Sequence, residues 1–110
     1  MIYHVITAYN WQKALAQGIY EAASLAAEGF IHASKQEQVK AVVERYYQNQ
    51  TGLLLLHIDE NKLTAALKYE LAPSVNEVFP HIYGRINLDA VVQITEITNN
   101  SREVKQGGTK

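Results

Sequence analysis

The chain has 110 residues, which is enough for one domain with a single hydrophobic core. It contains no cysteine, so disulfides, thiolate nucleophiles and cysteine-ligated zinc sites are excluded. Its formal net charge of -1 argues against a general nucleic-acid binder, which needs a basic face. Its apolar runs are far shorter than the roughly 20 residues of a membrane helix, and its first residues lack the features of a signal peptide. We therefore expect a cytoplasmic protein without membrane contact.

The hydrophobic pattern predicts two main helices and several strands. In chain order the expected elements are a strand over 2–8, a helix over 11–17, an extended segment over 19–23, a helical turn over 24–26, a strand over 30–32, a helix over 35–48, strands over 53–58 and 67–71, an irregular segment over 78–84, a turn over 87–89 and a strand over 91–98. Helices come early and strands late, which favours an α+β fold with a mainly antiparallel sheet. We expect one domain over residues 1–98 and a polar, disordered tail over residues 99–110.

Local signals predict how these elements begin and end. Asn10 is a good N-cap for the first helix, and Gly18 suits its C-terminal stop. Ser34 and Glu37 have the spacing of a capping box for the helix over 35–48. The apolar run over 53–58 is typical of a strand that is covered on both faces, so we place it centrally in a sheet.

Residues 28–34 form the strongest candidate site, because a turn, a short apolar strand and a polar tip follow one another there. His32 lies at the expected junction of strand and helix, where a side chain can be both fixed and reachable. A helix N-terminus offers unpaired N–H groups and partial positive charge, which suit a phosphate. His32 could therefore bind an anion or act as an acid–base group near pH 7. Ser34 is expected to cap the helix and line the site, not to act as a nucleophile.

Five other polar residues have both a structural and a functional interpretation. His4 lies in the middle of the first strand, where it is either a half-buried structural histidine or a ligand contact. His57 follows four leucines and is expected to be a strand residue near the edge of the core. Glu70 is either a solvated strand carboxylate or a catalyst. His81 and Tyr83 either hydrogen-bond the backbone of a rigid turn or form part of a site.

Two motif classes can be tested against these residues. Three histidines and Glu70 could hold a metal, but no H-x-x-x-H or H-x-H pair is present to nucleate a site, so we expect no metal. Two-histidine phosphodiesterases need paired H-x-S or H-x-T motifs. Residues 32–34 fit one such motif, and residues 81–83 do not fit the second. No G-x-S-x-G, P-loop or G-x-G-x-x-G motif is present.

The sequence resembles a small family, domain of unknown function 952, over nearly the whole chain up to about Val92. The residues that carry the resemblance are Tyr3-His4, Trp11, Gly18, Tyr20, Ser24-Leu25, Glu28-Gly29-Phe30-Ile31-His32-x-Ser34, Gln38, Leu55-x-x-Ile58-Asp59, Glu70 and Phe79-Pro80-His81-Ile82-Tyr83-Gly84. The chain departs from the family pattern at Ala33, where a cysteine is expected, and at Arg85, where a proline is expected. The Ala33 difference argues against thiol chemistry here, and the family implies no settled activity.

A second resemblance is to the catalytic domain of RNA 2′-phosphotransferases, in the ADP-ribosyltransferase superfamily. It rests on the order of Tyr3-His4, a helix, residues 29–34, a valine-striped helix and Leu55-x-x-Ile58-Asp59. It implies two small antiparallel sheets that form a cleft for NAD, with Tyr3-His4 against the ADP-ribose part. In this superfamily a carboxylate often stabilises the oxocarbenium-like ribose as nicotinamide leaves, and Glu70 is the candidate. The extra RNA-binding domain is absent and the chain is not basic, so we do not expect tRNA processing.

Our first hypothesis is an enzyme that binds NAD or ADP-ribose as a small nucleotide substrate and carries out glycosyl or ADP-ribosyl transfer or NAD hydrolysis. The expected catalytic residues are His32, Glu70 and His81, and the expected binding residues are Tyr3, His4, Ser34 and Tyr83, with Tyr83 able to stack on the nicotinamide ring. One alternative is a non-catalytic nucleotide-binding module. The other is a histidine-dependent phosphoesterase that uses His32 and His81 together.

Overall fold

The computed structural model describes residues 1–97, and the tail predicted for residues 99–110 lies outside them. The elements in chain order are β1 (Ile2–Thr7), α1 (Ala8–Gln17), β2 (Ile19–Tyr20), α2 (Ala23–Glu28), β3 (Ile31–His32), η1 (Gln36–Gln38), α3 (Val39–Tyr46), β4 (Leu53–Ile58), η2 (Glu60–Lys62), β5 (Ala66–Ala72), β6 (Glu77–Tyr83), β7 (Ile86–Asn87), η3 (Leu88–Ala90) and β8 (Val91–Ile97). The strand pairs of this part of the chain are antiparallel, which confirms the predicted α+β class.

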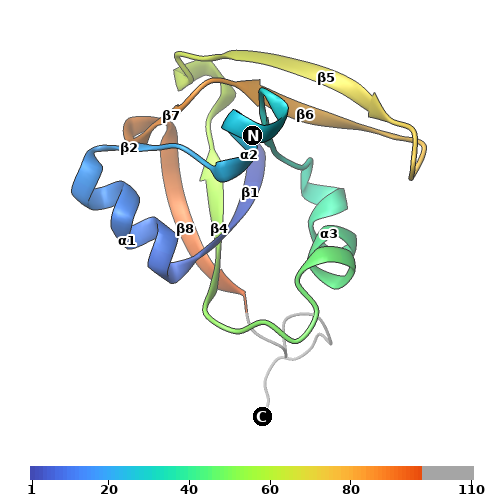
Figure 1. Ribbon diagram of the computed structural model, residues 1–110, viewed down its shortest axis with the longest axis horizontal. Helices are drawn as coiled ribbons and strands as arrows, with labels where there is room; N and C mark the ends of the chain where they lie inside the picture. Colours follow the sequence, from blue (N-terminus) through green and yellow to red (C-terminus); the bar gives the residue numbers. More distant parts are fainter. Residues whose placement is uncertain (98–110) are drawn as a thin grey trace.

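Two three-stranded sheets dominate the fold. The first has the order β1-β4-β8 and the second the order β3-β6-β5, while β2 pairs with β7. Figure 1 shows β5 and β6 crossing above β1 and β4, with α1 and α3 on either side of the first sheet. A backbone bridge joins the two sheets, because the amide of Tyr3 donates to the Ser34 carbonyl at 2.9 Å and the amide of Ser34 donates to the Tyr3 carbonyl at 2.7 Å.

The strand predicted over residues 53–58 is β4, and its central position in the first sheet is confirmed. Leu53, Leu56 and Ile58 are at most 1% exposed, because both neighbours and the packed faces remove them from water. The largest core cluster extends from this strand to the second sheet. Its fully buried aliphatic members are Ile2, Ile31, Leu56, Ile58, Ile82, Ile86 and Ala90.

The first helix begins earlier than predicted. Asn10 is not its N-cap. Thr7 holds that position, and its hydroxyl accepts a hydrogen bond from the Asn10 amide at 3.1 Å. The chain therefore passes from β1 into α1 without a loop, since the last strand residue also caps the helix. The predicted stop is confirmed, because Gly18 has φ of 80° and its amide bonds the Ala14 carbonyl.

The capping box predicted for Ser34 and Glu37 is wrong. Ser34 is only 3% exposed, and its backbone is held in an extended conformation by the bridge to Tyr3. The side chain of Gln38 caps the following turn instead, because its Oε1 accepts from the Lys35 amide at 2.9 Å. Its Nε2 donates to the carbonyl of Val78 on β6 at 2.9 Å. Tertiary contacts thus override the local signal, and α3 begins only after η1.

The segment over residues 78–84 was expected to be irregular, but it lies almost wholly in β6, the central strand of the second sheet. Proline is rare in central strands because it has no N–H for the ladder. Here the Pro80 carbonyl accepts from the Ala33 amide at 3.0 Å, on the side of β6 that faces β3. The N–H and C=O of one strand residue point to the same side, so the N–H that proline lacks would also face β3. The ladder between β3 and β6 ends at His32 for this reason. Proline is tolerated because the pairing stops where its N–H would be needed.

We expect Leu56→Ala to lower the free energy of unfolding by about 3 kcal/mol, because Leu56 is fully buried in the central strand and its truncation leaves a cavity. Leu15→Ala is the matched control. Leu15 is 49% exposed on α1, and its replacement should change the free energy by less than ~0.5 kcal/mol. Urea unfolding followed by circular dichroism measures both. Equal losses in the two variants would contradict the assigned core.

Candidate functional site

His4, in the middle of β1, is bonded through both ring nitrogens. Its Nδ1 lies 2.8 Å from the backbone carbonyl oxygen of His32, and its Nε2 lies 3.0 Å from the Tyr20 hydroxyl. A carbonyl only accepts, so Nδ1 carries the proton and donates to it. The side chain therefore ties β1 to β3, across the gap between the two larger sheets.

The protonation state of His4 follows from its surroundings. Burial lowers the pKa of His4 to about 4, so the ring is neutral at pH 7. With the proton on Nδ1, Nε2 can only accept, and the Tyr20 hydroxyl donates to it. Burial also raises the pKa of Tyr20 to about 12, which keeps this donor protonated. His4 is thus a positioned, neutral acceptor, and the oxygen of Tyr20 keeps lone pairs for another partner.

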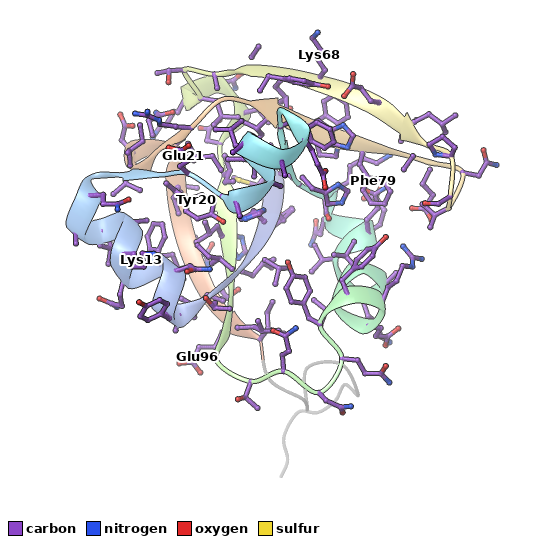
Figure 2. The ribbon with its side chains drawn as sticks, viewed as in Figure 1. Lys13, Tyr20, Glu21, Lys68, Phe79 and Glu96 are labelled. Atoms are coloured by element: carbon purple, nitrogen blue, oxygen red, sulfur yellow. The ribbon has the colours of Figure 1, made fainter. Side chains whose placement is uncertain are left out.

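These two side chains help to line a cavity of about 550 Å³, which we call the β1–α3 cavity. Its lining comes from β1, α1, β2, α2, β3, α3 and the residues that connect them. It consists of Tyr3, His4, Val5, Ile6, Thr7, Asn10, Tyr20, Ala22, Ser24, Glu28, His32, Ser34, Val42, Tyr46 and Tyr47. Figure 2 labels Tyr20 close to α2. In the described part of the chain, four tyrosines and several hydroxyl groups face this space, and Glu28 is the one charged lining residue. The cavity is therefore aromatic, rich in hydrogen-bonding groups and weakly acidic.

His32, at the end of β3, stands between this cavity and the second sheet. Its ring is half-buried, with centroids 4.7 Å from the Phe79 ring and 5.5 Å from the His81 ring. Its Nε2 is buried and has no hydrogen-bond partner within residues 1–97. Burial lowers the pKa of His32, and the nearby His81 adds to this effect. A neutral imidazole with an unpaired buried nitrogen marks a point where a ligand or a water molecule can bond.

A second group of polar side chains, which we call the carboxylate cluster, consists of Glu70, His81 and Tyr83. Glu70 Oε1 accepts from the Tyr83 hydroxyl at 2.6 Å and lies 2.7 Å from His81 Nδ1. The bond from Tyr83, followed by that from His81, holds the pKa of Glu70 below its ordinary value. The same carboxylate raises the pKa of Tyr83. Glu70 is therefore a bonded anion on β5, rather than a freely solvated carboxylate.

His81 is buried within this cluster. Phe30 stacks on it, with ring centroids 4.0 Å apart and an interplanar angle of 16°. Its contact with Glu70 places a proton on Nδ1, and Nε2 has no partner among the first 97 residues. Cross-strand register explains the arrangement, because His81 pairs with His32 on one side and with Lys68 on the other. A carboxylate that fixes Nδ1–H leaves Nε2 able to accept a proton, which is the arrangement of a general base.

The structure divides the predicted site residues into two groups. Tyr3, His4, His32 and Ser34 line the β1–α3 cavity, whereas Glu70, His81 and Tyr83 do not and form the carboxylate cluster. His32 contacts both groups, through its backbone carbonyl to His4 and its ring to His81.

His57 does not line the β1–α3 cavity and is not part of the carboxylate cluster, but it contacts Tyr3 of the first group. Its Nε2 bonds the Thr95 hydroxyl at 3.1 Å, and its ring meets Tyr3 edge-on at 5.0 Å. No set of three or more potential metal ligands comes together in residues 1–97.

Sequence reasoning missed several residues that shape the site. Tyr20, Tyr46 and Tyr47 line the cavity, and Phe30 covers His81. Tyr46 has the spacing of the valine stripe of its helix, which predicts a shared face with Val42 but not a cavity. Tyr47 had no such signal, because its direction depends on how α3 packs. Phe30 had a usable signal, because it shares the parity of His32 along an extended segment and so lies on the same face.

The fold and site define a small α+β protein with a histidine- and tyrosine-lined cavity between antiparallel sheets. Residues 5–94 match the family model described as "Protein of unknown function (DUF952)", and the chain belongs to this family. It is similar to protein CC0527 from Caulobacter crescentus. The crystal structure of CC0527 has 30% identity and a TM-score of 0.83, covering 96% of this chain and 92% of that one.

Two further structures of CC0527 agree with this similarity. The crystal structure of a double mutant, in which two residues are replaced by methionine, has 29% identity and a TM-score of 0.82, with the same coverage of 96% and 92%. The solution NMR structure has 31% identity and a TM-score of 0.75, covering 86% of this chain and 82% of that one. A comparison with curated proteins found no match. Within residues 1–97, no helix is long and apolar enough to cross a membrane.

We expect His4 to remain neutral, with its proton on Nδ1, down to about pH 5. Its pKa is about 4 in the folded protein against an ordinary value of 6.5, so between these values only the unfolded chain takes up the proton. The free energy of unfolding should therefore fall as pH drops through this window, with His4 contributing up to ~3 kcal/mol. Nitrogen-15 spectra of the imidazole measure the titration directly. A His4 midpoint near 6.5 would contradict the enclosed, carbonyl-bonded ring.

Proposed function

We propose that this chain binds NAD or ADP-ribose in the β1–α3 cavity and acts on the glycosidic bond of the nucleotide, as an ADP-ribosyltransferase-like transferase or an NAD hydrolase. The observation that carries this proposal is the buried, unpaired Nε2 of His32, at the boundary between the cavity and the carboxylate cluster. Burying such a nitrogen costs free energy unless a ligand or water bonds it. The resemblance of Tyr3-His4 and residues 29–34 to the 2′-phosphotransferase catalytic domain supports a nucleotide as this ligand.

The cavity lining favours one end of the dinucleotide. A volume of about 550 Å³ is within the usual range for small-molecule sites. Its tyrosines and Glu28 suit the cationic nicotinamide ring, which aromatic faces and a carboxylate both attract. Among residues 1–97 no Lys or Arg lines the cavity, so this part of the chain offers a diphosphate little inside it. We therefore place the nicotinamide riboside end in the cavity and the phosphates towards solvent, with a cavity tyrosine rather than Tyr83 against the ring.

The proposed reaction breaks the bond between ribose C1′ and the nicotinamide nitrogen, and the bonding electrons leave with nicotinamide. Water or an acceptor hydroxyl then bonds C1′ and gives up a proton. His32 would contact the ribose at the boundary of the cavity. With C1′ held there, His81, whose ring centroid lies 5.5 Å from that of His32, would take up this proton at Nε2. Glu70 would stabilise the resulting imidazolium through Nδ1, across the 2.7 Å contact.

The two alternatives use the same geometry differently. A histidine phosphoesterase would place a phosphate between His32 and His81, whose ring centroids are 5.5 Å apart. The cavity supports it less, because none of its lining residues within positions 1–97 is a lysine or arginine that could hold the phosphate charge. A nucleotide-binding module would use the cavity but not the carboxylate cluster, so measurements of binding and turnover separate it from the enzyme.

We expect NAD and nicotinamide riboside to bind the wild-type protein, and His32→Ala to weaken binding at least about tenfold by removing the unpaired nitrogen. Leu15→Ala is the control, since Leu15 is 49% exposed on α1, does not line this cavity and should change affinity less than about twofold. Isothermal titration calorimetry on variants with native circular dichroism measures this. Absence of heat at millimolar NAD, or an equal loss of affinity in both variants, would contradict NAD as the ligand of this cavity.

We expect Glu70→Gln to leave NAD affinity within about twofold but to lower NAD cleavage by about 10²-fold or more, because the amide keeps the shape and loses the charge beside His81. Glu44→Gln on the exposed face of α3 is the control and should behave as wild type. Release of nicotinamide, followed by chromatography, gives the rate. Wild-type cleavage in Glu70→Gln would rule out the carboxylate cluster, and binding without any cleavage in the wild type would favour the module.

A further inference from the structure

Within residues 1–97, no other strand pairs with the outer edge of β5. It is the terminal strand of the order β3-β6-β5, and Figure 1 shows it along the outer rim of the molecule. Tyr69 faces Pro80 across the pair, and the Pro80 carbonyl is already bonded to β3. The Tyr69–Pro80 pair is therefore a non-hydrogen-bonded pair, so the N–H and C=O of Tyr69 point away from β6. By the period of two along a strand, the same holds for Leu67 and Leu71.

The side chains along this edge are unusually apolar for an exposed strand. Tyr69 is 47% exposed and Leu71 is 56% exposed, and Val78, which faces Leu71 on β6, is 40% exposed. Exposed edge strands with apolar faces attract other strands, and proteins usually blunt them with charge, proline or bulges. Within β5 the only charges are Lys68 and Glu70, of opposite sign.

The sequence of β5 is complementary to itself when it is reversed. It runs Ala-Leu-Lys-Tyr-Glu-Leu-Ala over Ala66–Ala72. An antiparallel pair of two such strands centred on Tyr69 places alanine opposite alanine, leucine opposite leucine and tyrosine opposite tyrosine. The two remaining positions place Lys68 opposite the partner's Glu70 and Glu70 opposite the partner's Lys68. Opposite charges directly across a strand pair stabilise it, whereas like charges destabilise it.

We propose that a second copy of this chain pairs with β5 in this register, so that the two second sheets form one six-stranded sheet about a twofold axis at Tyr69. The outward backbone groups of Leu67, Tyr69 and Leu71 would all be paired. Lys68 and Glu70 fall in non-hydrogen-bonded pairs, where cross-strand side chains lie closest. One strand pair buries less than the roughly 1,200 Å² of a standard interface, so the dimer is a weak one with a micromolar or higher dissociation constant.

This pairing reaches the carboxylate cluster. Glu70 binds His81 and Tyr83 through Oε1, and Lys68 stands 4.9 Å from the centroid of the Tyr83 ring. In the dimer the partner's Lys68 lies beside Glu70 and adds a cation to its surroundings. The dimer itself does not depend on the proposed function, because it follows from the edge and sequence of β5 alone.

A charge-exchange experiment tests the register. In Lys68→Glu both pairs become Glu opposite Glu, and in Glu70→Lys both become Lys opposite Lys, so we expect each variant alone to be monomeric. Mixed in equal amounts they restore two opposite-charge pairs, and a heterodimer should form. Sedimentation velocity of the full chain from about 10 to about 500 µM, at low and high salt, measures this against wild type. Lys62→Glu, outside β5, is the control and should dimerise as wild type does.

A cysteine experiment tests the axis without altering these charges. The chain has no cysteine, so each single substitution introduces one thiol. Tyr69→Cys places two thiols opposite each other on the twofold axis and should form a disulfide-linked dimer under mild oxidation. In Leu67→Cys the thiol lies opposite the partner's Leu71, and in Leu71→Cys it lies opposite the partner's Leu67, so in neither variant do two thiols face each other. Both variants should therefore crosslink at least about tenfold more slowly.

The two experiments together support or overturn the proposal. Dimerisation of wild type, loss in each charge variant, recovery on mixing and preferential crosslinking at position 69 support it. A wild-type protein that stays monomeric at about 500 µM would overturn the proposed dimer and would favour a strand of a different protein as the partner of β5. Equal crosslinking at positions 67, 69 and 71, or dimers that ignore the charge variants, would overturn the register.

Discussion

The hydrogen bond from His4 to the carbonyl of His32 is the contact on which the site depends. Together with the backbone bridge between Tyr3 and Ser34, it joins β1 of one sheet to the end of β3 of the other. The wall of the cavity follows from this joint, because Tyr3, His4, His32 and Ser34 all line it. A histidine performs this task without carrying charge, since burial keeps the His4 ring neutral at pH 7.

The two polar groups differ in electrostatics as well as in place. His4 and His32 have lowered pKa values because burial disfavours the charged imidazole. Glu70 has a lowered pKa for another reason, because Tyr83 and His81 bond its charged form. The two neighbouring histidines therefore differ, because His81 is bonded to the Glu70 carboxylate whereas Nε2 of His32 has no partner within residues 1–97. Such asymmetry separates acid from base in many enzymes.

Local chemistry predicted the features that depend on one element. The leucine run of β4 was placed centrally because strong apolar burial requires cover on both faces, and Gly18 ends α1 because its backbone adopts positive φ. Features that depend on two elements were not predictable in this way. Ser34 had a strong capping signal, but the bridge to Tyr3 decided its conformation. The bonding of Glu70 to His81 follows from the register between β5 and β6, which no single segment specifies.

Pro80 has a wider consequence for the second sheet. An imino acid in the middle strand interrupts the ladder beyond His32, because the next hydrogen-bonded pair, Ala33 with Pro80, lacks the amide that the ring has replaced. The short β3 leaves the following residues free to cross over to β1 instead. Pro80 thus helps to fix the point at which the chain leaves the second sheet and pairs with β1 through Ser34, next to His32 and the cavity.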